Sequence, residues 1–451
     1  MKLDAIDPQW AWEPWEPTAV ESWDTARIAA LYRRAAFCAS PKDIQAAQTR
    51  EPQEVVDGLF AEHPQHAQFE EESSQITSAV RASGDIQQLS TWWLHRMLLH
   101  PQPLVEKLTL FWHGHFATGA EKVQDVELML QQNQLLREHA LGDFRTMVHG
   151  IAKDPAMLIY LDSVTNRKAH ANENFARELM ELFCLGEGNY TEQDVQELAR
   201  CFTGWEIRRK QFRFNRYQHD GEAKHVLGKQ VEAGEEAIDQ VLSSKHLPYF
   251  ITYKLFKFFV CDEPSPPRAL LEPLARQFAS DNLSLRGTLR TMLGSRLLMS
   301  NWSAGRKVRS PVEMAVGMLR SLAGTTNLIE LSRQLREVGQ AVFFPPNVKG
   351  WDGGRAWVNS STLVGRANLV HHIVRDENTR FAGGELSDML RSYDATQPEK
   401  MLTWIAERFL AVPLSTQQSQ TLLASLEDKP AKQASRELLS LLAALPQFHL
   451  A

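Results

Sequence analysis

Two histidines flank a glycine in the segment Trp112–Phe116, and imidazoles at this spacing are candidates for metal chemistry. His115 continues the apolar stripe of the helical run before it (Leu104, Leu108 and Phe111), so we expect it to be partly buried. On an unbroken helix His113 and His115 point apart, and they converge only if the helix opens at Gly114, which a glycine permits. Converged imidazoles would begin a site for Zn, Mn or Fe. An unbroken helix would leave one buried, hydrogen-bonded histidine and one exposed histidine.

A second group of chemical residues lies in residues 172–181, which read NENFARELME. At helical spacing Glu178 and Glu181 share one stripe, and Glu173 and Arg177 lie beside it. Carboxylates one turn apart can bind a hard cation or divide acid and base roles. We therefore predict Glu178 and Glu181 as metal ligands, Glu173 as a general acid or base, and Arg177 as a contact to an anionic substrate. The alternative is a solvated face with ion pairs from Arg177 to Glu173 and Glu181.

The segment His219–Lys224 ends a strand-like run and contains an Asp-Gly turn. His219 could complete the metal site, Asp220 could act as general acid or base, and Lys224 could contact an anionic substrate. The alternative is an ordinary turn with an incidental histidine.

A loop rich in Pro and Gly, residues 345–354, carries Lys349 and Trp351. A stiff start, an aromatic ring and a flexible exit are typical of a shaped loop, and the indole of Trp351 could stack on a flat ligand beside Lys349. We predict these two residues as substrate-binding. The alternative is a structural loop that pins two helices together.

The elements that must position these residues are mostly helical, because apolar residues recur at the 3.6-residue period along most of the chain. Thr191 and Asp194 have the spacing of a helix capping box. Alternation around residues 206–220 predicts one short β hairpin. The predicted class is mainly α: a large multi-helix body with that insertion. We treat residues 1–451 as a single unit. It comprises a Trp- and Pro-rich arm (1–24), a helical body with the candidate site (25–377), a linker (378–399) and C-terminal helices (400–451).

Composition and charge exclude several classes of protein. The 451 residues have 43% hydrophobic content and a net charge of −6, which argues against disorder and against a broadly basic nucleic-acid binder. Four scattered cysteines without a CxxC pair argue against a zinc ribbon or a disulfide scaffold. Without a signal peptide or an 18-residue apolar run, the sequence predicts a cytoplasmic chain with no transmembrane segment.

Several of these segments occur together and in order: EKLTLFWHGHFATG, NENFARELMELFCLGEGNYTEQDVQELARCFTGW, HDGEAKHVLG and PPNVKGWDGG. In this set the chain resembles the bacterial family catalogued as domain of unknown function 1800, over nearly its whole length. The resemblance implies a large, mostly helical protein. It also implies a sulfatase-like partner of the family called domain of unknown function 1501, whose genes often lie beside those of this family. Many family members are exported, in contrast to the cytoplasmic expectation above. This chain departs from the family pattern at Ala171, where Pro is usual, and at Cys38, where Gly is usual.

Two functions from different classes follow. The first is a metal-dependent enzyme, a hydrolase with Zn or Mg in preference to an oxygenase with Fe, whose metal is held by His113, His115, Glu178, Glu181 and His219. The second is a non-catalytic binding or accessory protein that acts with the sulfatase-like partner. An enzyme requires the candidate segments to converge on one pocket, whereas an accessory protein does not.

Overall fold

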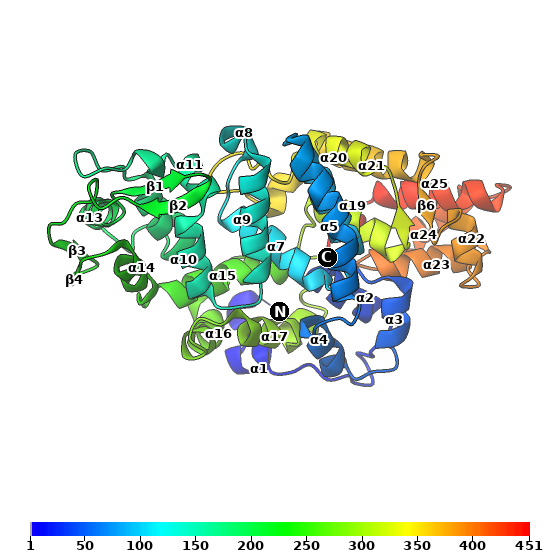
Figure 1. Cartoon of the computed structure of the whole chain (residues 1–451). Coiled ribbons are helices and arrows are strands. Elements are labelled where there is room, and N and C mark those ends of the chain that lie inside the picture. Colours follow the sequence, from blue (N-terminus) through cyan, green and yellow to red (C-terminus); the bar gives the residue numbers. More distant parts are fainter. Residues whose placement is uncertain (1) are drawn as a thin grey trace.

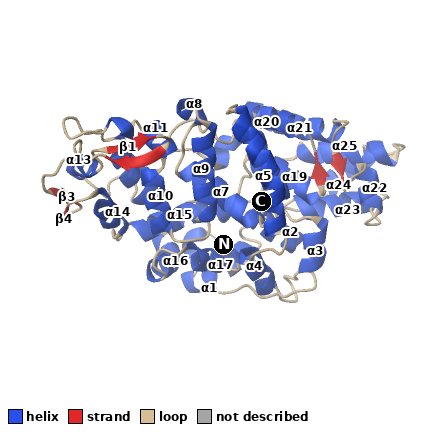
Figure 2. Ribbon diagram, in the orientation of Figure 1, coloured by secondary structure: helices blue, strands red, loops and turns tan. Residues whose placement is uncertain are grey.

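The computed structural model describes residues 2–451 and shows an elongated, mostly helical body (Figure 1). The strands within these residues form three small antiparallel sheets of two strands each, scattered among the helices (Figure 2). The predicted class, a large multi-helix body with a short β hairpin, is confirmed.

Residues 2–24 lie on the body. They contain the 3₁₀ turn η1 (Leu3–Ala5) and α1 (Pro8–Trp12), which packs on α16 (Arg268–Ser280) and α18 (Arg296–Met299). The indole of Trp12 donates a hydrogen bond of 2.6 Å to the carbonyl of Leu270. Buried tryptophans therefore fix this Pro-rich segment to the surface of the helices.

Two hydrophobic cores hold the molecule together, and α7 (Pro103–His115) contributes to both. The first core also draws on α2 (Thr25–Ala35), α3 (Pro41–Ala47), α4 (Pro52–Phe60), α10 (Phe144–Lys153), α11 (Pro155–Tyr160), α12 (Asn174–Glu178), α13 (Glu192–Cys201), α14 (Gly234–Leu242), α15 (Leu247–Phe259) and α17 (Leu285–Leu293). The second core draws on α5 (His66–Ser83), α6 (Gln88–Leu99), α8 (Ala120–Val123), α9 (Val126–Glu138), α19 (Pro311–Ser321), α20 (Leu328–Glu337), α21 (Ser360–Arg375), α22 (Leu386–Arg391), α23 (Pro398–Phe409), α24 (Thr416–Ala424) and α25 (Ala431–Ala443). Short 3₁₀ turns complete the helical part: η2 (Ser163–Thr165), η4 (Gly354–Trp357) and η5 (Pro446–His449).

Because α7 is buried on all sides, its charged residues need partners inside the protein. Glu106 accepts hydrogen bonds from Arg137 at 2.7 Å, from Arg96 at 3.2 Å and from the Trp93 indole at 2.8 Å. The next residue, Lys107, forms an ion pair of 2.6 Å with Glu313 on α19. These pairs connect α7 to α6, α9 and α19.

The predicted hairpin is β1 (Trp205–Arg208) paired with β2 (Gln211–Phe214). Arg209 and Lys210 both have positive φ, the conformation of the tight turns that fit the twist of two strands. A second hairpin, β3 (Lys224–Val226) with β4 (Lys229–Val231), follows and packs on α13. The capping box of Thr191 and Asp194 begins α13, as its spacing predicts.

The segment predicted as a linker, residues 378–399, contains β6 (Arg380–Phe381) and α22. β6 pairs with β5 (Gly324–Thr325), and Leu386 and Leu390 of α22 are buried. The carboxylate of Glu385 forms ion pairs with Lys432 and Arg436 of α25, so this segment is packed into the body.

Residues near the two ends of the sequence meet in the middle of the molecule. Arg34 on α2 is buried and donates to the carbonyls of Ser303 at 2.7 Å and Ala451 at 2.6 Å. The amide of Ala451 donates to the carbonyl of Lys307 at 2.8 Å, and Val308 forms an isolated β-bridge with Leu450. Residues 449–451 therefore form one wall beside residues 305–309.

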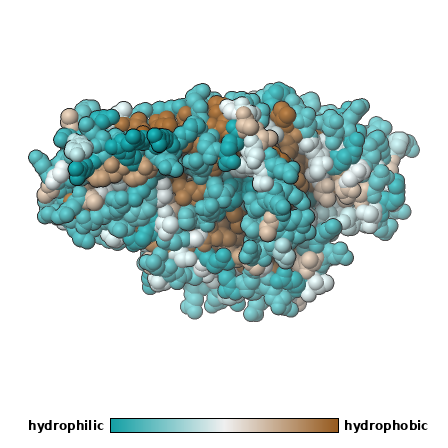
Figure 3. All heavy atoms as spheres, in the orientation of Figure 1, coloured by the Kyte–Doolittle hydropathy of each residue, from teal (hydrophilic) through white to brown (hydrophobic). Residues whose placement is uncertain are grey.

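One face of the molecule is mostly hydrophilic, with hydrophobic side chains gathered in its recessed middle, in the region of α7 and α9 (Figure 3). Among residues 2–451 we find no helix that combines the length and the apolar character needed to cross a bilayer.

Candidate functional site

A pocket of about 370 Å³ lies where the C-terminal end of α7 meets α15 and the loop of residues 345–354. Its volume is in the range of small-molecule sites. His115, Lys349 and Trp351, three residues singled out from the sequence, line it. A larger cavity of about 840 Å³ between α2 and α23 has a mainly aliphatic wall and contains none of the predicted site residues.

Both histidines of α7 are buried, and the helix continues through Gly114 to His115. The opening that would bring the imidazoles together is therefore absent, and each ring has its own partner. Nε2 of His113 accepts a hydrogen bond of 3.0 Å from the amide of Phe343, and burial lowers the pKa of His113 to about 3. The expectation that one of the two would be exposed is wrong, because residues 343–351 cover that side of α7.

His115 joins the sequence motif of residues 172–186 to the pocket. Its Nε2 lies 3.0 Å from the carbonyl oxygen of Phe183, and its Nδ1 lies 3.2 Å from Nζ of Lys254. The carbonyl can only accept, so Nε2 carries the proton and Nδ1 faces the lysine with its lone pair. Burial and, secondly, the charge of Lys254 hold the pKa of His115 well below its ordinary value. The imidazole is therefore neutral.

Lys254 occupies an unusual environment for a lysine. It is largely buried, and its Nζ donates to the carbonyl of Leu182 at 2.8 Å. Burial lowers the pKa of Lys254 to about 8. The amine is therefore partly neutral near physiological pH, as is required of a lysine that gives and takes protons.

The carbonyls that hold His115 and Lys254 come from a π-helical turn, Leu179–Cys184, labelled η3, which continues α12. Wider π turns are rare and frequently lie at functional sites. The last carbonyls of a helix lack partners within the helix and carry partial negative charge. Leu182 and Phe183 use theirs to accept from the pocket residues.

The loop of residues 345–354 is fixed to the end of α7 by a close backbone contact. Gly350 has φ of +75°, and a Cβ atom there would collide with the carbonyl oxygen of Gly114. Trp351 packs on the same turn, with its ring 5.8 Å from that of His113. The loop thus places Lys349 and Trp351 in the pocket wall and contacts α7 at the glycine between the two histidines.

The pocket has a surplus of positive charge. Lys307 is paired with Asp262 at 2.6 Å, and Glu313 is paired with Lys107, so these charges cancel. The remaining charged residues of the wall have no ion-pair partner within residues 2–451: Lys254, Lys257, Lys349 and Asp352. Three lysines against one aspartate, with the aromatic rings of Trp351 and Trp357, suit an anion with a flat or apolar part.

Glu178 and Glu181 differ in environment. Burial and then the charge of Glu181 raise the pKa of Glu178, while Arg177 and Lys349 act in the opposite direction. The hydroxyl of Tyr190 donates to Glu181 at 2.7 Å. Arg177 pairs with Glu173 at 3.1 Å, as the solvated-face interpretation expects, and with Glu192 at 2.8 Å in place of Glu181.

The segment His219–Lys224 lies in a separate network at the end of α13. Nδ1 of His219 is 2.9 Å from the carbonyl of Thr203, and Asp220 pairs with Arg200 at 2.7 Å. Lys224 is buried and donates to the carbonyls of Asp220 and Glu222. All three candidates have partners inside this network, and none of them lines the pocket.

The five predicted metal ligands have no common centre within residues 2–451: His113, His115, Glu178, Glu181 and His219. His115 already has a partner on each ring nitrogen, and His219 belongs to the network at α13. A group of three side chains that could hold an ion occurs elsewhere, at His66, Glu70 and His100. A metal role for the five predicted residues stays a prediction.

Sequence reasoning missed Lys254 and Lys257, which complete the pocket. The signal was present: two lysines at i, i+3 interrupt the apolar run of residues 247–259. A lysine on an otherwise buried helix face requires a polar partner or a pocket.

The fold and the pocket define a mainly α protein with a cationic cavity assembled from motifs that are distant in sequence. The chain belongs to the family described as "Protein of unknown function (DUF1800)", whose model matches residues 30–450. Comparison with curated proteins and with solved structures finds no match.

Proposed function

We propose that the protein is an enzyme that binds a small organic anion in the pocket beside Trp351 and uses Lys254 as its general acid and base. The observation that carries this proposal is the contact of 3.2 Å between Nζ of Lys254 and Nδ1 of the neutral, buried His115. A lysine with a pKa of about 8 exchanges a proton readily near neutral pH. His115 keeps the amine in place without adding a second charge.

Hydrolysis of an ester is the reaction that this arrangement serves best. Neutral Lys254 takes a proton from water, the resulting hydroxide attacks the ester, and the ammonium returns the proton to the departing alcohol. The anionic group of the substrate binds Lys349 and Lys257, and its apolar part lies against Trp351. A metal-dependent form of the same hydrolase would need Lys254 to leave Nδ1 of His115 before that nitrogen could bind an ion.

Binding is tested first, with phenyl phosphate as the probe in isothermal titration calorimetry. We expect binding to the wild type, with affinity at least about 10-fold lower in Lys349→Ala, because one charge-assisted contact contributes roughly 1.5–3 kcal/mol. Lys245→Ala, an exposed lysine just before α15, is the matched control and should bind like the wild type. Equal affinity in Lys349→Ala and the control would contradict the binding site.

Catalysis is tested with p-nitrophenyl phosphate, p-nitrophenyl sulfate and p-nitrophenyl acetate. We expect turnover of an anionic ester in preference to the acetate, with Lys254→Met lowering kcat about 100-fold or more and Lys349→Ala raising mainly KM. Binding of phenyl phosphate without turnover of any ester would refute the hydrolase.

The accessory role beside a sulfatase-like partner is the competing proposal. Two motif segments, the end of α7 and the 345–354 loop, line one pocket, and the carbonyls of Leu182 and Phe183 in a third contact its Lys254 and His115, which supports the enzyme. A chain that neither binds phenyl phosphate nor hydrolyses the three esters would favour the accessory role.

A further inference from the structure

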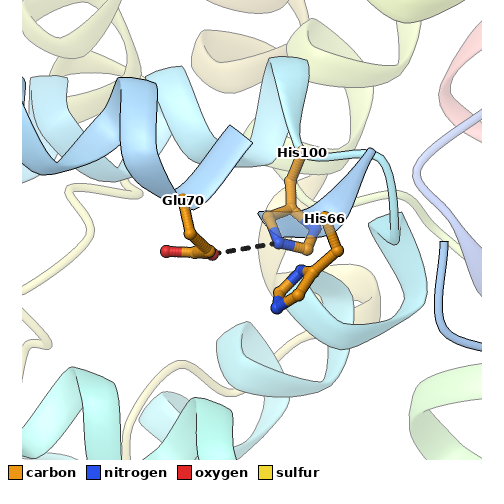
Figure 4. Close-up of side chains that lie close together, drawn as sticks. All are labelled: His66, Glu70 and His100. Carbon is orange, nitrogen blue, oxygen red and sulfur yellow. Dashed lines mark ion pairs between the residues drawn. The ribbon is translucent and has the colours of Figure 1, made fainter. Parts of the chain in front are cut away.

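Outside the pocket, three potential metal ligands gather where the start of α5 meets the end of α6 (Figure 4). His66 and Glu70 are four residues apart on α5 and therefore share one face of the helix. His100 is the C-cap residue of α6. One ligand atom from each of the three lies within 4.8 Å of the other two.

His100 is fully buried, and its Nε2 has no hydrogen-bond partner within residues 2–451. The Nδ1 atom accepts a hydrogen bond of 3.0 Å from the amide of Gln102 and also lies 3.2 Å from the carbonyl oxygen of Gln102, which accepts when Nδ1 carries the proton. In the first tautomer Nε2 carries a proton towards Oε1 of Glu70 at 3.3 Å, and in the second it presents its lone pair there, as metal binding requires. A metal-bound histidine typically has this arrangement, with the other ring nitrogen donating to a backbone carbonyl.

The distance between Nε2 and Oε1 fits a shared ion. Two ligand atoms at about 2.0 Å from a tetrahedral zinc are separated by about 3.3 Å. Two facing lone pairs repel unless a cation or a proton lies between them. His66 contributes a second unpartnered ring nitrogen, because its Nδ1 is also buried without a hydrogen bond in the described chain. The rings of His66 and His100 are 5.3 Å apart.

The surroundings of Glu70 orient its carboxylate. Arg96 donates to both carboxylate oxygens and continues to Glu106, which also binds Arg137. The charges of the two arginines and the two glutamates cancel, so an ion at the histidines would add net positive charge. Glu70 is still one-third exposed, so water reaches the place where this charge would lie.

We propose that His66, Glu70 and His100 form a binding site for a divalent transition-metal ion of the zinc type, with water as the fourth ligand. Two imidazoles and one carboxylate are a common zinc ligand set. The ion would fasten the first turn of α5 to the corner between α6 and α7. This site is separate from the pocket and does not depend on the function proposed for it.

The test is titration of the full, tag-free chain with ZnCl₂ by calorimetry and with CoCl₂ by visible absorption. We expect one ion per chain, with the d–d absorption of tetrahedral cobalt. The affinity should fall at least about 100-fold in His66→Ala and in His100→Ala, because each removes one of three protein ligands. His63→Ala, three residues before His66, removes a neighbouring histidine outside the group and should leave the affinity unchanged.

His100→Ala empties a buried position and can reduce folding, so His66→Ala and Glu70→Gln, at partly exposed positions, decide the outcome. Zinc binding that persists in both variants, or no stoichiometric binding to the wild type, would overturn the site. The absence of zinc binding to the wild type would mean that a proton, and not a metal ion, lies between Nε2 of His100 and the carboxylate of Glu70. Far-UV circular dichroism and thermal unfolding of each variant serve as the fold control.

Discussion

At the scale of single residues, the ionisation of Lys254 is the property on which the proposed chemistry depends. Brief acetylation with acetic anhydride at pH 6–11, read by mass spectrometry, reports which amines are neutral. We expect acetylation of Lys254 to reach half its maximum near pH 8, because burial destabilises the ammonium form. Exposed Lys245 is the internal reference. If acetylation of Lys254 and of Lys245 increases over the same pH range, burial does not shift the pKa of Lys254.

Asp154 makes a second prediction at this scale. It caps α11 and accepts from the amide of Met157 at 2.8 Å and from Gln132 at 2.7 Å, and burial raises its pKa to about 7. Since this value lies above the ordinary 3.8, the group stabilises the fold below about pH 4, and that contribution is lost as the pH rises towards 7.

Asp154→Asn keeps an N-cap side chain but cannot ionise. Its free energy of unfolding relative to wild type should therefore improve with pH between about 4.5 and 6.5, by roughly 1 kcal/mol per pH unit. Urea unfolding at several pH values measures this difference. Parallel curves for the two proteins would show that Asp154 does not titrate in this range.

At the scale of elements, the contact between the 345–354 loop and the end of α7 depends on one glycine. Gly350→Ala should lower stability by about 1–3 kcal/mol and abolish phenyl phosphate binding, because the added methyl group collides with the Gly114 carbonyl and the residue has positive φ. Thermal unfolding and calorimetry measure the two effects.

The matched control lies across the same contact. A Cβ at Gly114 would be 3.8 Å from Trp351, an ordinary contact, and the residue is helical. Gly114→Ala should therefore leave stability unchanged or raise it by up to about 1 kcal/mol. If Gly114→Ala destabilises as much as Gly350→Ala, the collision is not the cause.

Much of the element structure could be predicted from periodicity, but its departures from regular helix could not. Residues 172–186 have a helical pattern, yet the structure divides them into α12 and the π turn η3. Nothing local in the sequence indicates this π turn. Its carbonyls accept from Lys254 and His115, which are distant in the sequence, so the contacts made at the turn cannot be read from residues 172–186 alone. The predicted linker at 378–399 is polar in composition, but its few apolar residues, such as Leu386 and Leu390, are buried.

Only part of the candidate site could be predicted from the sequence, because some of its contacts join segments that are distant in the chain. His115, Lys349 and Trp351 line the pocket, and their types and motifs marked them in the sequence. Lys254 lies 139 residues from His115, so their contact depends on packing of α15 against α7. The expected meeting of His113 and His115 needed an opening of α7 that packing on both sides of the helix prevents.

At the scale of the whole molecule, the charges buried on α7 connect the two cores. Glu106→Gln leaves Arg96 and Arg137 without their shared carboxylate, so we expect a loss of about 3–5 kcal/mol in the free energy of unfolding. Lys122→Ala breaks a half-exposed ion pair with Asp162 and should cost less than about 1 kcal/mol. Urea unfolding measures both, and equal losses would show that the buried network contributes no more than a surface pair.

The wall formed by residues 449–451 beside residues 305–309 has a consequence for how the protein is made. The ribosome delivers residues 449–451 after residues 2–448, yet Arg34 donates to the carbonyl of Ala451 and the carbonyl of Lys307 accepts from its amide. Until then Arg34, in the last turn of α2, lacks one of its carbonyl acceptors, and the carbonyl of Lys307 lacks its amide partner. These contacts therefore form only after residues 449–451 have been made, and a nascent chain stalled before residue 448 would carry Arg34 and Lys307 without them.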